Sequence, residues 1–488
     1  MSLSTSPGGA RDSSAVRAPS PAPERPTRYW VRTLLILLLL TEQSALGFSL
    51  IAPTLPKVAN EFATPNVVWV MTAFTLSGAL ASPILGRLAD SYGKKKMLVV
   101  TATIGAVGAL ISAVAPTFAI FVLGRFLSGV GFACMALGYT LIRDVFPPRL
   151  QPISISIANT GVGAVGVGAL FLSGVLIDHL GFRSVFWFAC AFCALGAVLT
   201  LLFVPETAVR ARSRIDWAGA GLLAAAMLSI MLGLSQGKVW GWSDPRIIGL
   251  LVLAVVGFAA WVWWERRTAE PLIRIDLIAN PALRFVLIGG GLAYGATTLL
   301  ATIVPMLLQT SAAPYGFGLS ATTMALWLLP GQMMIVASGF FVGATAESIG
   351  FRRHLILGGV LIAVTAVLLS TVPSAAAVVV VAWMIFGFGC MIYAAVPNLA
   401  LLTLPETERA VGSNFVGVSQ TLCGTLVSTV GFAVLAQNVL SSGAHGVVYA
   451  ESGFRYAFLV AGAAASIGAL VAIAVPRMRA SGATGPTG

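Results

Sequence analysis

Glu42 is the residue whose type and position most clearly suggest chemistry. It lies about ten residues inside the apolar run 31–52, and it is the only acidic residue deep in any run that we expect to cross a membrane. At about 1.5 Å per helical residue, it would lie about 15 Å from the start of that helix. A carboxylate at such a depth costs about 2.5–3.5 kcal/mol, and burial favours the protonated carboxyl. Glu42 is therefore a candidate proton or cation site; the alternative is an acid in a static ion pair or facing water.

Arg125 is the natural counter-charge for Glu42, because it is a cation within another apolar run, 117–143. A permanent positive charge would favour the ionised form of a nearby acid and so oppose the effect of burial. A proton or a substrate could then shift that balance. The alternative is an arginine whose side chain reaches the outer membrane interface. We predict a proton-coupling role for Glu42 and Arg125.

These charges require elements that cross a bilayer, and the composition supplies them. The chain has 488 residues, of which 58% are hydrophobic and 9% are charged, whereas soluble proteins have about 25% charged residues. We expect an all-α polytopic membrane protein with fourteen spans. The expected spans cover 31–52, 67–88, 96–115, 117–143, 151–177, 184–204, 216–235, 246–264, 283–309, 320–345, 354–372, 375–401, 412–437 and 455–475.

The spans divide into a six-helix bundle at 31–204, a linker with two additional helices at 205–282, and a second six-helix bundle at 283–475. Residues 1–28 are rich in Ser, Pro, Ala and Arg without an apolar core, so we expect a disordered tail and not a signal peptide. Residues 476–488 form the other tail. Both tails are expected on the cytoplasmic side.

The net charge of +12 could indicate a nucleic-acid partner, but its distribution argues against one. With loops assigned alternately inside and outside, 23 of the 29 Lys and Arg residues fall on cytoplasmic segments. This bias is the positive-inside rule of membrane proteins. We therefore expect a lipid bilayer as the partner and no nucleic acid.

The basic loop Gly86–Leu98 has a weaker copy at Gly343–Leu355. The matched residues are Gly86, Asp90, Gly93, Lys95, Lys96 and Leu98 with Gly343, Glu347, Gly350, Arg352, Arg353 and Leu355. A second echo relates Gly181-Phe182-Arg183 to Gly453-Phe454-Arg455. Two echoes so far apart predict a duplicated bundle, as in many secondary transporters.

The loop Gly86–Leu98 resembles the loop between helices 2 and 3 of the major facilitator superfamily. The resemblance implies an N-bundle and a C-bundle of six helices each that rock about a central site. Arg125 resembles the family's span-4 arginine motif, with Ser128 where the family commonly has Gln. Short strings near the additional helices, including Asp216-Trp217 and Asn280-Pro281, resemble the fourteen-helix drug:proton antiporter branch.

The fifth span departs from this branch. The antiporter signature Gly-Pro-x-x-Gly-Gly aligns with residues 169–174, where only Gly174 matches. This departure leaves open an importer or a facilitator of a small organic solute, working by uniport or symport, instead of an antiporter.

Residues at the expected cytoplasmic helix ends could control the conformational change. Arg143 and Asp144 could form an ion pair at the end of their helix or a latch between the bundles, and the same alternatives hold for Asp90 and Glu347. Gly86 would let the second span approach the opposite bundle closely. The candidate gating residues are Gly86, Asp90, Gly93, Lys94, Lys95, Arg143, Asp144, Glu347 and Arg352.

Polar and aromatic residues within the spans could line a substrate cavity or could equally pack between helices. The candidates are Gln43, Phe48, Tyr139, Tyr294, Gln309, Trp327, Gln332, Tyr393, Asn398, Asn414 and Gln420. The C-bundle offers no buried charge that could pair with an ionic substrate, so Glu42 is the single anion expected to face a substrate. We therefore expect a lipophilic or cationic small molecule.

Other motifs do not support an enzyme. Cys190-x-x-Cys193 has no second pair and lies in an apolar run, as do the other three cysteines. Gly161, Gly163 and Gly166 match a dinucleotide fingerprint, but they follow no strand and suit helix packing instead. His179, His354 and His445 are expected in loops on both sides. A membrane enzyme or a receptor without transport stays a distant alternative.

We therefore expect a secondary active transporter, most simply a proton-driven exporter of amphipathic small molecules such as drugs, antibiotics or secondary metabolites. It would need no cofactor beyond the proton gradient. We expect a monomer in the bacterial inner membrane.

Overall fold

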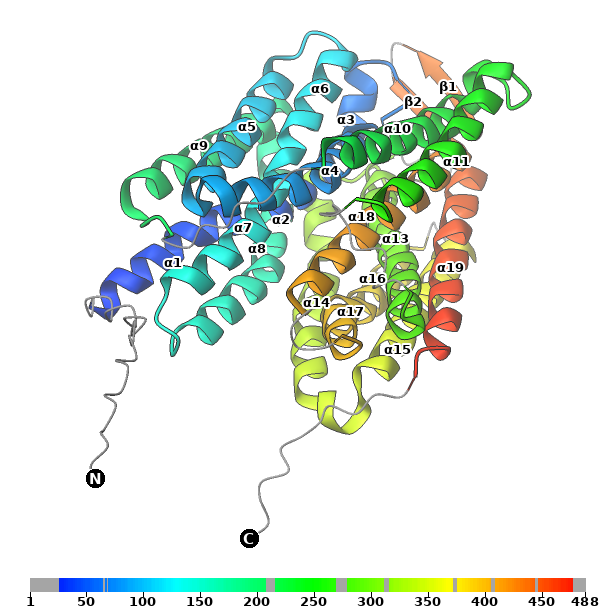
Figure 1. Ribbon diagram of the computed structural model, residues 1–488. Coiled ribbons are helices and arrows are strands. Elements are labelled where there is room, and N and C mark those ends of the chain that lie inside the picture. The colour runs from blue at the N-terminus through cyan, green and yellow to red at the C-terminus, as the bar shows by residue number, and fades with distance from the viewer. Residues whose placement is uncertain are drawn as a thin grey trace, which may run out of the picture.

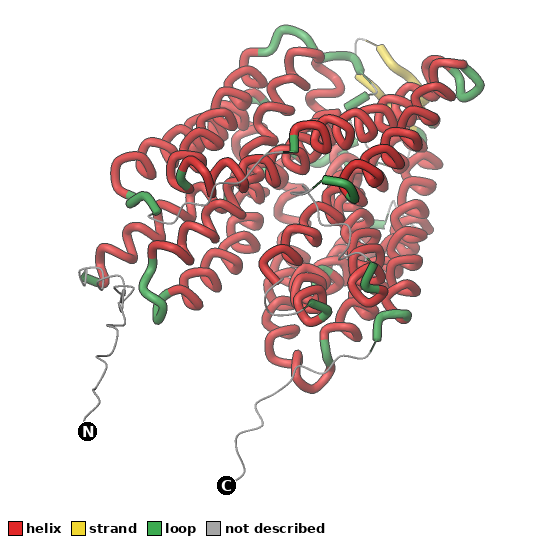
Figure 2. Tube along the Cα trace, viewed as in Figure 1, coloured by secondary structure: helices red, strands yellow, loops and turns green. Residues whose placement is uncertain are grey.

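Long apolar helices make up almost all of this protein in the computed structural model (Figure 2). The structure describes residues 26–64, 66–67, 69–207, 216–268, 279–310, 316–371, 375–404, 409–443 and 446–476. The expected tails, except for residues 26–28 and 476, and the Arg210–Arg214 linker lie outside these ranges.

The N-bundle contains the first half of the helices (Figure 1). They are α1 (Thr27–Thr41), α2 (Gln43–Ser49), a 3-10 turn (Ala52–Thr54), α3 (Leu55–Glu61), α4 (Trp69–Tyr92), α5 (Lys94–Val114), α6 (Phe118–Gly129), a 3-10 turn (Val130–Phe132), α7 (Ala133–Val145), α8 (Gln151–Leu180) and α9 (Arg183–Phe203). The expected first span is therefore interrupted at Glu42, and the expected fourth span contains the 3-10 turn between α6 and α7.

The C-bundle contains the second half of the helices and one short hairpin (Figure 1). They are α13 (Pro281–Gln309), α14 (Ala321–Ile349), α15 (Phe351–Thr371), α16 (Ala376–Gly389), α17 (Ile392–Leu402), α18 (Arg409–Gln437), β1 (Val439–Gly443), β2 (Gly446–Tyr449) and α19 (Glu451–Ile473). The two strands pair antiparallel between α18 and α19. The strands were not predicted from the sequence.

Two additional helices, α10 (Trp217–Trp240) and α11 (Pro245–Glu265), pack against each other. Helix α10 also contacts α4 of the N-bundle and α18 of the C-bundle, so the pair lies across one seam between the bundles (Figure 1). Side chains of α11 are largely exposed on the outer surface, as expected for a helix that faces lipid.

The two bundles repeat the same helix pairings. Helix α5 packs on α6 and α9, and the corresponding helix α15 packs on α16 and α19. Helix α4 packs on α6, and α14 packs on α16. Both of these last crossings rely on a glycine. A Cβ on Gly129 of α6 would collide with the Phe74 carbonyl oxygen of α4, and one on Gly387 of α16 would collide with the Gly331 carbonyl oxygen of α14. The duplication predicted from the loops is therefore visible in the packing.

The two sequence echoes differ in how well they correspond in structure. Gly93 and Gly350 both adopt positive φ angles, 108° and 81°, directly before α5 and α15, so this loop is truly repeated. Gly181 has φ 79° and ends α8, whereas Gly453 lies in the first turn of α19. The segments 181–183 and 453–455 therefore share their sequence, and Phe186 and Phe458 are both buried, but the two segments do not form the same turn.

The molecule has two distinct ends. We call the end with the Gly93 and Gly350 turns the basic-loop end, and the end with β1 and β2 the hairpin end (Figure 1). Near the hairpin end the bundles meet: Gln309 Nε2 of α13 donates to the Pro53 carbonyl oxygen at 3.0 Å, and β2 contacts α3. Further along the seam, the Thr75 and Thr425 hydroxyls are 3.2 Å apart.

At the basic-loop end the bundles are apart. A Cβ built on Gly86 of α4 or on Gly343 of α14 would have no atom within 4 Å. The close approach of α4 to the opposite bundle that we predicted at Gly86 is therefore absent in this conformation. In the described part of the chain, the bundles are in contact at the hairpin end and separated at the basic-loop end; we call the first end closed and the second open.

Eleven helices in the described part of the chain are long and apolar enough to cross a membrane, or twelve if the bent α4 counts as one span. Helices α8 and α18 are 30 and 29 residues long, although their side chains are described only in part. Helices thus occupy all fourteen expected ranges, while fourteen membrane crossings stay a prediction.

Candidate functional site

Glu42 lies at the junction between α1 and α2, with φ −81° and ψ −5°. The helical hydrogen bonds continue through this junction, from Glu42 N to the Leu38 oxygen and from Leu46 N to the Glu42 oxygen, both at 3.0 Å. The backbone groups of the junction are therefore satisfied. Because Thr27 starts α1, Glu42 lies about 22 Å along that helix.

The Glu42 carboxyl group is buried, with 3% of the residue exposed. Neither of its oxygens has a hydrogen-bond partner among the described residues. The neighbouring helix is α7, where Gly138 contacts the Thr41 methyl group, Met135 accepts from the Ser44 hydroxyl, and Tyr139 lies within electrostatic reach of Glu42. A buried carboxyl without a partner is unfavourable as an anion and is suited to bind and release a proton.

Arg125 is buried in the N-bundle but does not pair with Glu42. Its Nε donates to the Val70 carbonyl oxygen and its Nη2 to the Gly47 carbonyl oxygen, both at 3.1 Å. Its guanidinium lies 4.5 Å from the Phe74 ring centre. The expected pairing of Arg125 with Glu42 is therefore absent in this conformation, and the Arg125 side chain is enclosed by protein, with 2% of the residue exposed.

The contact with Gly47 has a local cause. Ile51 N, which would continue the helix by bonding to the Gly47 oxygen, bonds instead to the Phe48 oxygen at 3.3 Å where the 3-10 turn begins. The Gly47 carbonyl is thereby freed, and a polar group in a membrane interior must find a partner. Arg125 provides it and so ties α6 to the segment that follows Glu42.

We expect Arg125→Lys to lower the thermal stability of the purified protein. Lysine keeps the charge, but its single nitrogen cannot reach two carbonyls as the guanidinium fork does. An unsatisfied buried carbonyl costs about 1–3 kcal/mol. Thermal unfolding in detergent measures the effect, with Arg246→Lys as the control, because the exposed Arg246 guanidinium lies over the Trp240 ring and, within the described residues, bonds to no buried carbonyl. Equal melting temperatures for the two variants would contradict this role.

Gln43 does not line a cavity, contrary to our prediction. It is 6% exposed and fills the space between Gly105 of α5 and Gly131 of the 3-10 turn, where a Cβ on either glycine would collide with its amide group. Gln43 is therefore a packing residue that holds the start of α2 against α5 and the 3-10 turn. The sequence places Gln43 at the right depth but cannot indicate the direction of its side chain.

Tyr294 and Tyr393 come together in the C-bundle. Their rings are in edge-to-face contact with centres 5.5 Å apart, and the Tyr393 hydroxyl donates to Thr297 Oγ1 at 3.0 Å. Tyr393 is 40% exposed, so this aromatic pair is accessible from one side. Such a pair could stack against an apolar or aromatic substrate.

The remaining cavity candidates are dispersed. Gln309 joins the bundles at the hairpin end and is not free to bind a substrate there. Trp327 packs edge-to-face on Phe317, and Asn398 is exposed and bonds to its own helix. The half-buried candidates are Phe48, Gln332 and Gln420, and the Asn414 side chain lies outside the described residues.

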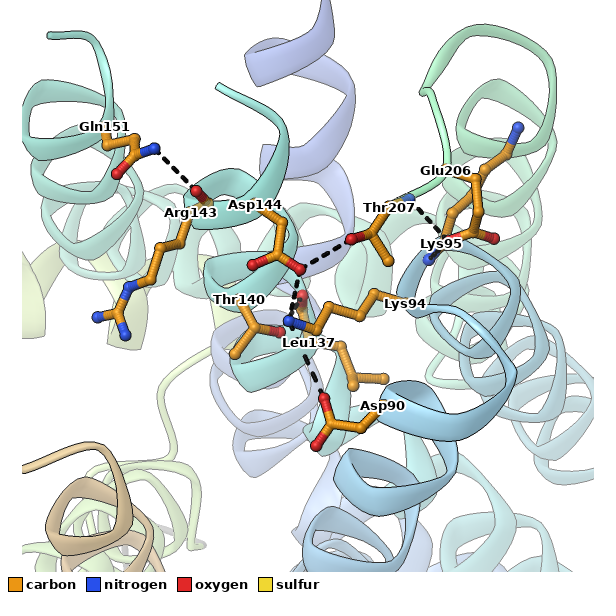
Figure 3. A network of polar contacts seen from close by, with 10 residues as sticks. All are labelled: Asp90, Lys94, Lys95, Leu137, Thr140, Arg143, Asp144, Gln151, Glu206 and Thr207. Carbon is orange, nitrogen blue, oxygen red and sulfur yellow. Dashed lines mark hydrogen bonds and ion pairs between the residues drawn. The ribbon is translucent and has the colours of Figure 1, made fainter. Parts of the chain in front are cut away.

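The gating residues of the N-bundle form a network at the basic-loop end (Figure 3). Lys94 Nζ lies 2.6 Å from Asp144 Oδ2 and 4.0 Å from Asp90 Oδ1. Thr207 donates to the same Asp144 oxygen at 2.9 Å. The network therefore joins α4, α5, α7 and the segment after α9, all within one bundle.

Arg143 and Asp144 do not form the helix-end ion pair that we predicted. Asp144 pairs with Lys94, and the Arg143 side chain points away from it, while its carbonyl oxygen accepts from Gln151 Nε2 at 2.8 Å (Figure 3). In this conformation none of these described side chains contacts the C-bundle, so a latch between bundles stays a prediction.

Glu206 is a member of this part of the structure that the sequence analysis missed. Its Oε1 accepts from Lys95 N at 2.9 Å and its Oε2 from Lys96 N at 3.1 Å, so it caps the start of α5. A Cβ on Gly93 would press on this carboxylate at 2.9 Å. A Pro-Glu pair directly after an apolar run, at Pro205-Glu206, was the available signal.

In the C-bundle copy of the loop, an arginine that caps a helix end takes the place of the carboxylate that caps a helix start in the N-bundle. Arg352 donates to the carbonyl oxygens of Ala472 and Ile473, at 3.4 and 2.5 Å, and so caps the end of α19. Glu347 is exposed. His354 was expected in a loop but is buried in α15, where its ring nitrogens lie 3.0 Å from the Gly350 oxygen and 2.8 Å from Thr345 Oγ1.

The described residues contain no group of three His, Cys, Asp or Glu side chains that could hold a metal ion. The fold and the repeated loop define a membrane transporter with two related helical bundles. The family model described as Major Facilitator Superfamily matches residues 37–428, and the chain belongs to this superfamily.

The relatives agree with the resemblance predicted from the sequence. The chain is 25% identical to "Multidrug resistance protein 3" of Bacillus subtilis, over 75% of this chain and 71% of the relative. It is 30% identical to the "Lincomycin resistance protein" of Streptomyces lincolnensis, over 67% of this chain and 68% of the relative. A solved peptide transporter in complex with sulfate shares the fold with a TM-score of 0.66 and 14% identity, covering 91% of this chain and 94% of that one.

Proposed function

We propose that this protein exports amphipathic small molecules across the membrane by exchange with protons. The observation that carries the proposal is Glu42, a buried carboxyl group without a hydrogen-bond partner among the described residues, at the junction of α1 and α2 in the first span. The names of the relatives, multidrug and lincomycin resistance proteins, support a drug or antibiotic as substrate. The aromatic pair Tyr294 and Tyr393 supports a lipophilic one, and the single acid supports a cationic one.

We further propose that the basic-loop end faces the cytoplasm of a bacterial inner membrane. The excess of Lys and Arg on this side supports the orientation. In that orientation the present conformation is open to the cytoplasm and closed to the outside, and both termini are cytoplasmic. The proposed unit is a monomer that uses the proton gradient and no bound cofactor.

In the proposed cycle, substrate enters from the cytoplasm or the inner leaflet while Glu42 is ionised. The bundles then rock to open the hairpin end, and external protons neutralise Glu42 as the substrate leaves. The protonated carrier returns and releases its proton inside. One proton crossing about 100 mV provides about 2.3 kcal/mol, and one pH unit adds about 1.4 kcal/mol. Together they sustain about a 500-fold gradient of a neutral substrate.

Transport by purified protein in liposomes tests the proposal. With an acidic lumen, protons leave down their gradient, and substrate should accumulate inside by exchange. Lincomycin and a lipophilic cationic dye are suitable probes. Accumulation that disappears when the proton gradient is collapsed supports exchange. Uptake that is the same with and without the proton gradient would reject exchange.

An importer or facilitator is the second candidate, because only Gly174 of the antiporter signature is present in α8. The same liposomes distinguish it. A symporter would accumulate substrate with an acidic exterior, when protons and substrate move in the same direction, and a facilitator would only equilibrate it.

A further inference from the structure

A carboxylate at the end of the N-bundle caps a helix of the C-bundle. Asp178, in the last turn of α8, accepts from Ala321 N at 3.1 Å through Oδ1 and from Thr322 N at 2.8 Å through Oδ2. Both donors belong to the first turn of α14. The contact lies at the hairpin end, where the two bundles meet.

The start of α14 is fully satisfied only when Asp178 is in place. A helix begins with amide groups that lack helical acceptors. In α14, Ser320 Oγ accepts from Thr323 N at 3.2 Å, and Asp178 takes the two preceding amides. An ionised carboxylate is the favoured partner there, because the helix N-terminus carries partial positive charge.

Gly174 brings the two helices close enough for this contact. It lies one turn before Asp178 on the same face of α8. A Cβ on Gly174 would lie 2.7 Å from Thr322 Cα and 2.8 Å from the Ala321 oxygen. The helices therefore touch backbone to backbone, and Asp178 locks the register of that contact.

The Glu206 cap lies within one bundle and so provides a comparison for the Asp178 cap, which lies between two bundles. Glu206 makes the same kind of cap, on two amides of α5, but donor and acceptor lie in one bundle. Rocking of the bundles leaves that cap intact. The Asp178 cap joins two bundles, so it must break each time the hairpin end opens.

We propose that Asp178 is a positioning residue that holds the hairpin end closed by capping α14 across the bundle interface. The inference rests on alternating access as set out under the proposed function, but it requires neither proton coupling nor a particular substrate. Loss of the cap shifts the protein towards the state that is open at the hairpin end. An exposed cap of this kind is expected to change the ratio of open to closed molecules about two- to tenfold.

Distances across the hairpin end test the proposal. Spin labels at residues 119 and 440, which are exposed on the N-bundle and C-bundle respectively, report the separation by pulsed electron paramagnetic resonance in a cysteine-free background. We expect Asp178→Asn to increase the long-distance population two- to tenfold over the parent. The control is Glu61→Gln, which removes a carboxylate at the same end whose partner, Arg183, lies in the same bundle.

A second variant approaches the contact from the other bundle. Ala321→Pro removes one amide donor, and proline is well suited to the first helical position after an extended residue such as Ser320. We expect the same shift, and the double variant should shift little further, because both changes break one contact. Distances in both single variants that match those of the parent and of Glu61→Gln would overturn the proposal. This readout needs no substrate, so its failure is distinct from failure of the proposed export.

Discussion

Glu42→Gln is expected to abolish gradient-driven export and leave a folded, membrane-inserted protein. Glutamine has the size of glutamate but cannot bind and release a proton. In the proposed cycle, the carrier would then have no means of coupling the return step to proton movement. Accumulation against a gradient should fall at least 100-fold, so that the substrate at most equilibrates across the membrane.

The substitution should not weaken the fold. Neither Glu42 oxygen is bonded within the described residues, so no buried partner is left unsatisfied, and the cost of a charge at this depth is removed. The melting temperature of the variant should equal or exceed that of the wild type. Downhill equilibration of substrate, which needs no proton coupling, should persist.

The matched control is Glu451→Gln. Glu451 is also acidic but forms a surface ion pair with Arg455 one turn along α19, and such pairs contribute little. Export by this variant should match the wild type at every pH. The rate of the wild type should vary with the pH gradient, while Glu42→Gln should show a flat profile. Normal export by Glu42→Gln would remove Glu42 from the mechanism.

Gly387→Ala is expected to be among the most destabilising single-methyl changes in the chain. Its Cβ would collide with the Gly331 carbonyl oxygen, and a backbone group in a helix cannot move aside as a flexible side chain can. Helices α14 and α16 would have to separate, and overpacking of this kind costs about 1–3 kcal/mol or more. Monodisperse protein yield and melting temperature in detergent measure the loss.

Gly339→Ala is the control, since it adds the same methyl group to α14 at a position with no atom within 4 Å. Alanine is the better helix former, so this variant should be neutral or slightly stabilised. Gly129→Ala, at the corresponding crossing of the N-bundle, should behave like Gly387→Ala. Different behaviour of Gly129→Ala and Gly387→Ala would contradict the equivalence of the two crossings.

Depth along a helix could be predicted from this sequence, but direction around the helix could not. Apolar runs place Glu42 and Arg125 in the membrane, and both are buried. Their pairing was wrong because it requires two side chains to face each other. Arg125 faces the Gly47 carbonyl instead, which became available only because the first span changes to a 3-10 turn after α2.

The contacts between bundles were the least predictable. Asp178 lies one residue past an expected span, and nothing in its own segment indicates that two amides of α14 are its partners. Gln309 was expected in the cavity, but it bonds to Pro53 in the other bundle. Such contacts also change with the conformation, because they form only when that end of the protein is closed. The sequence of either segment alone does not indicate which end is closed.

Proton release upon substrate binding tests the central claim most directly, namely that one buried carboxyl group exchanges a proton for a substrate. Purified protein in weakly buffered detergent at slightly acidic pH, with a pH-sensitive dye, should release up to about one proton per molecule when a transported substrate is added. Glu42→Gln, whose neutral side chain resembles the protonated carboxyl group, should bind the substrate more weakly and release no proton. Equal release from Glu42→Gln, or binding to the wild type without any release, would contradict the account.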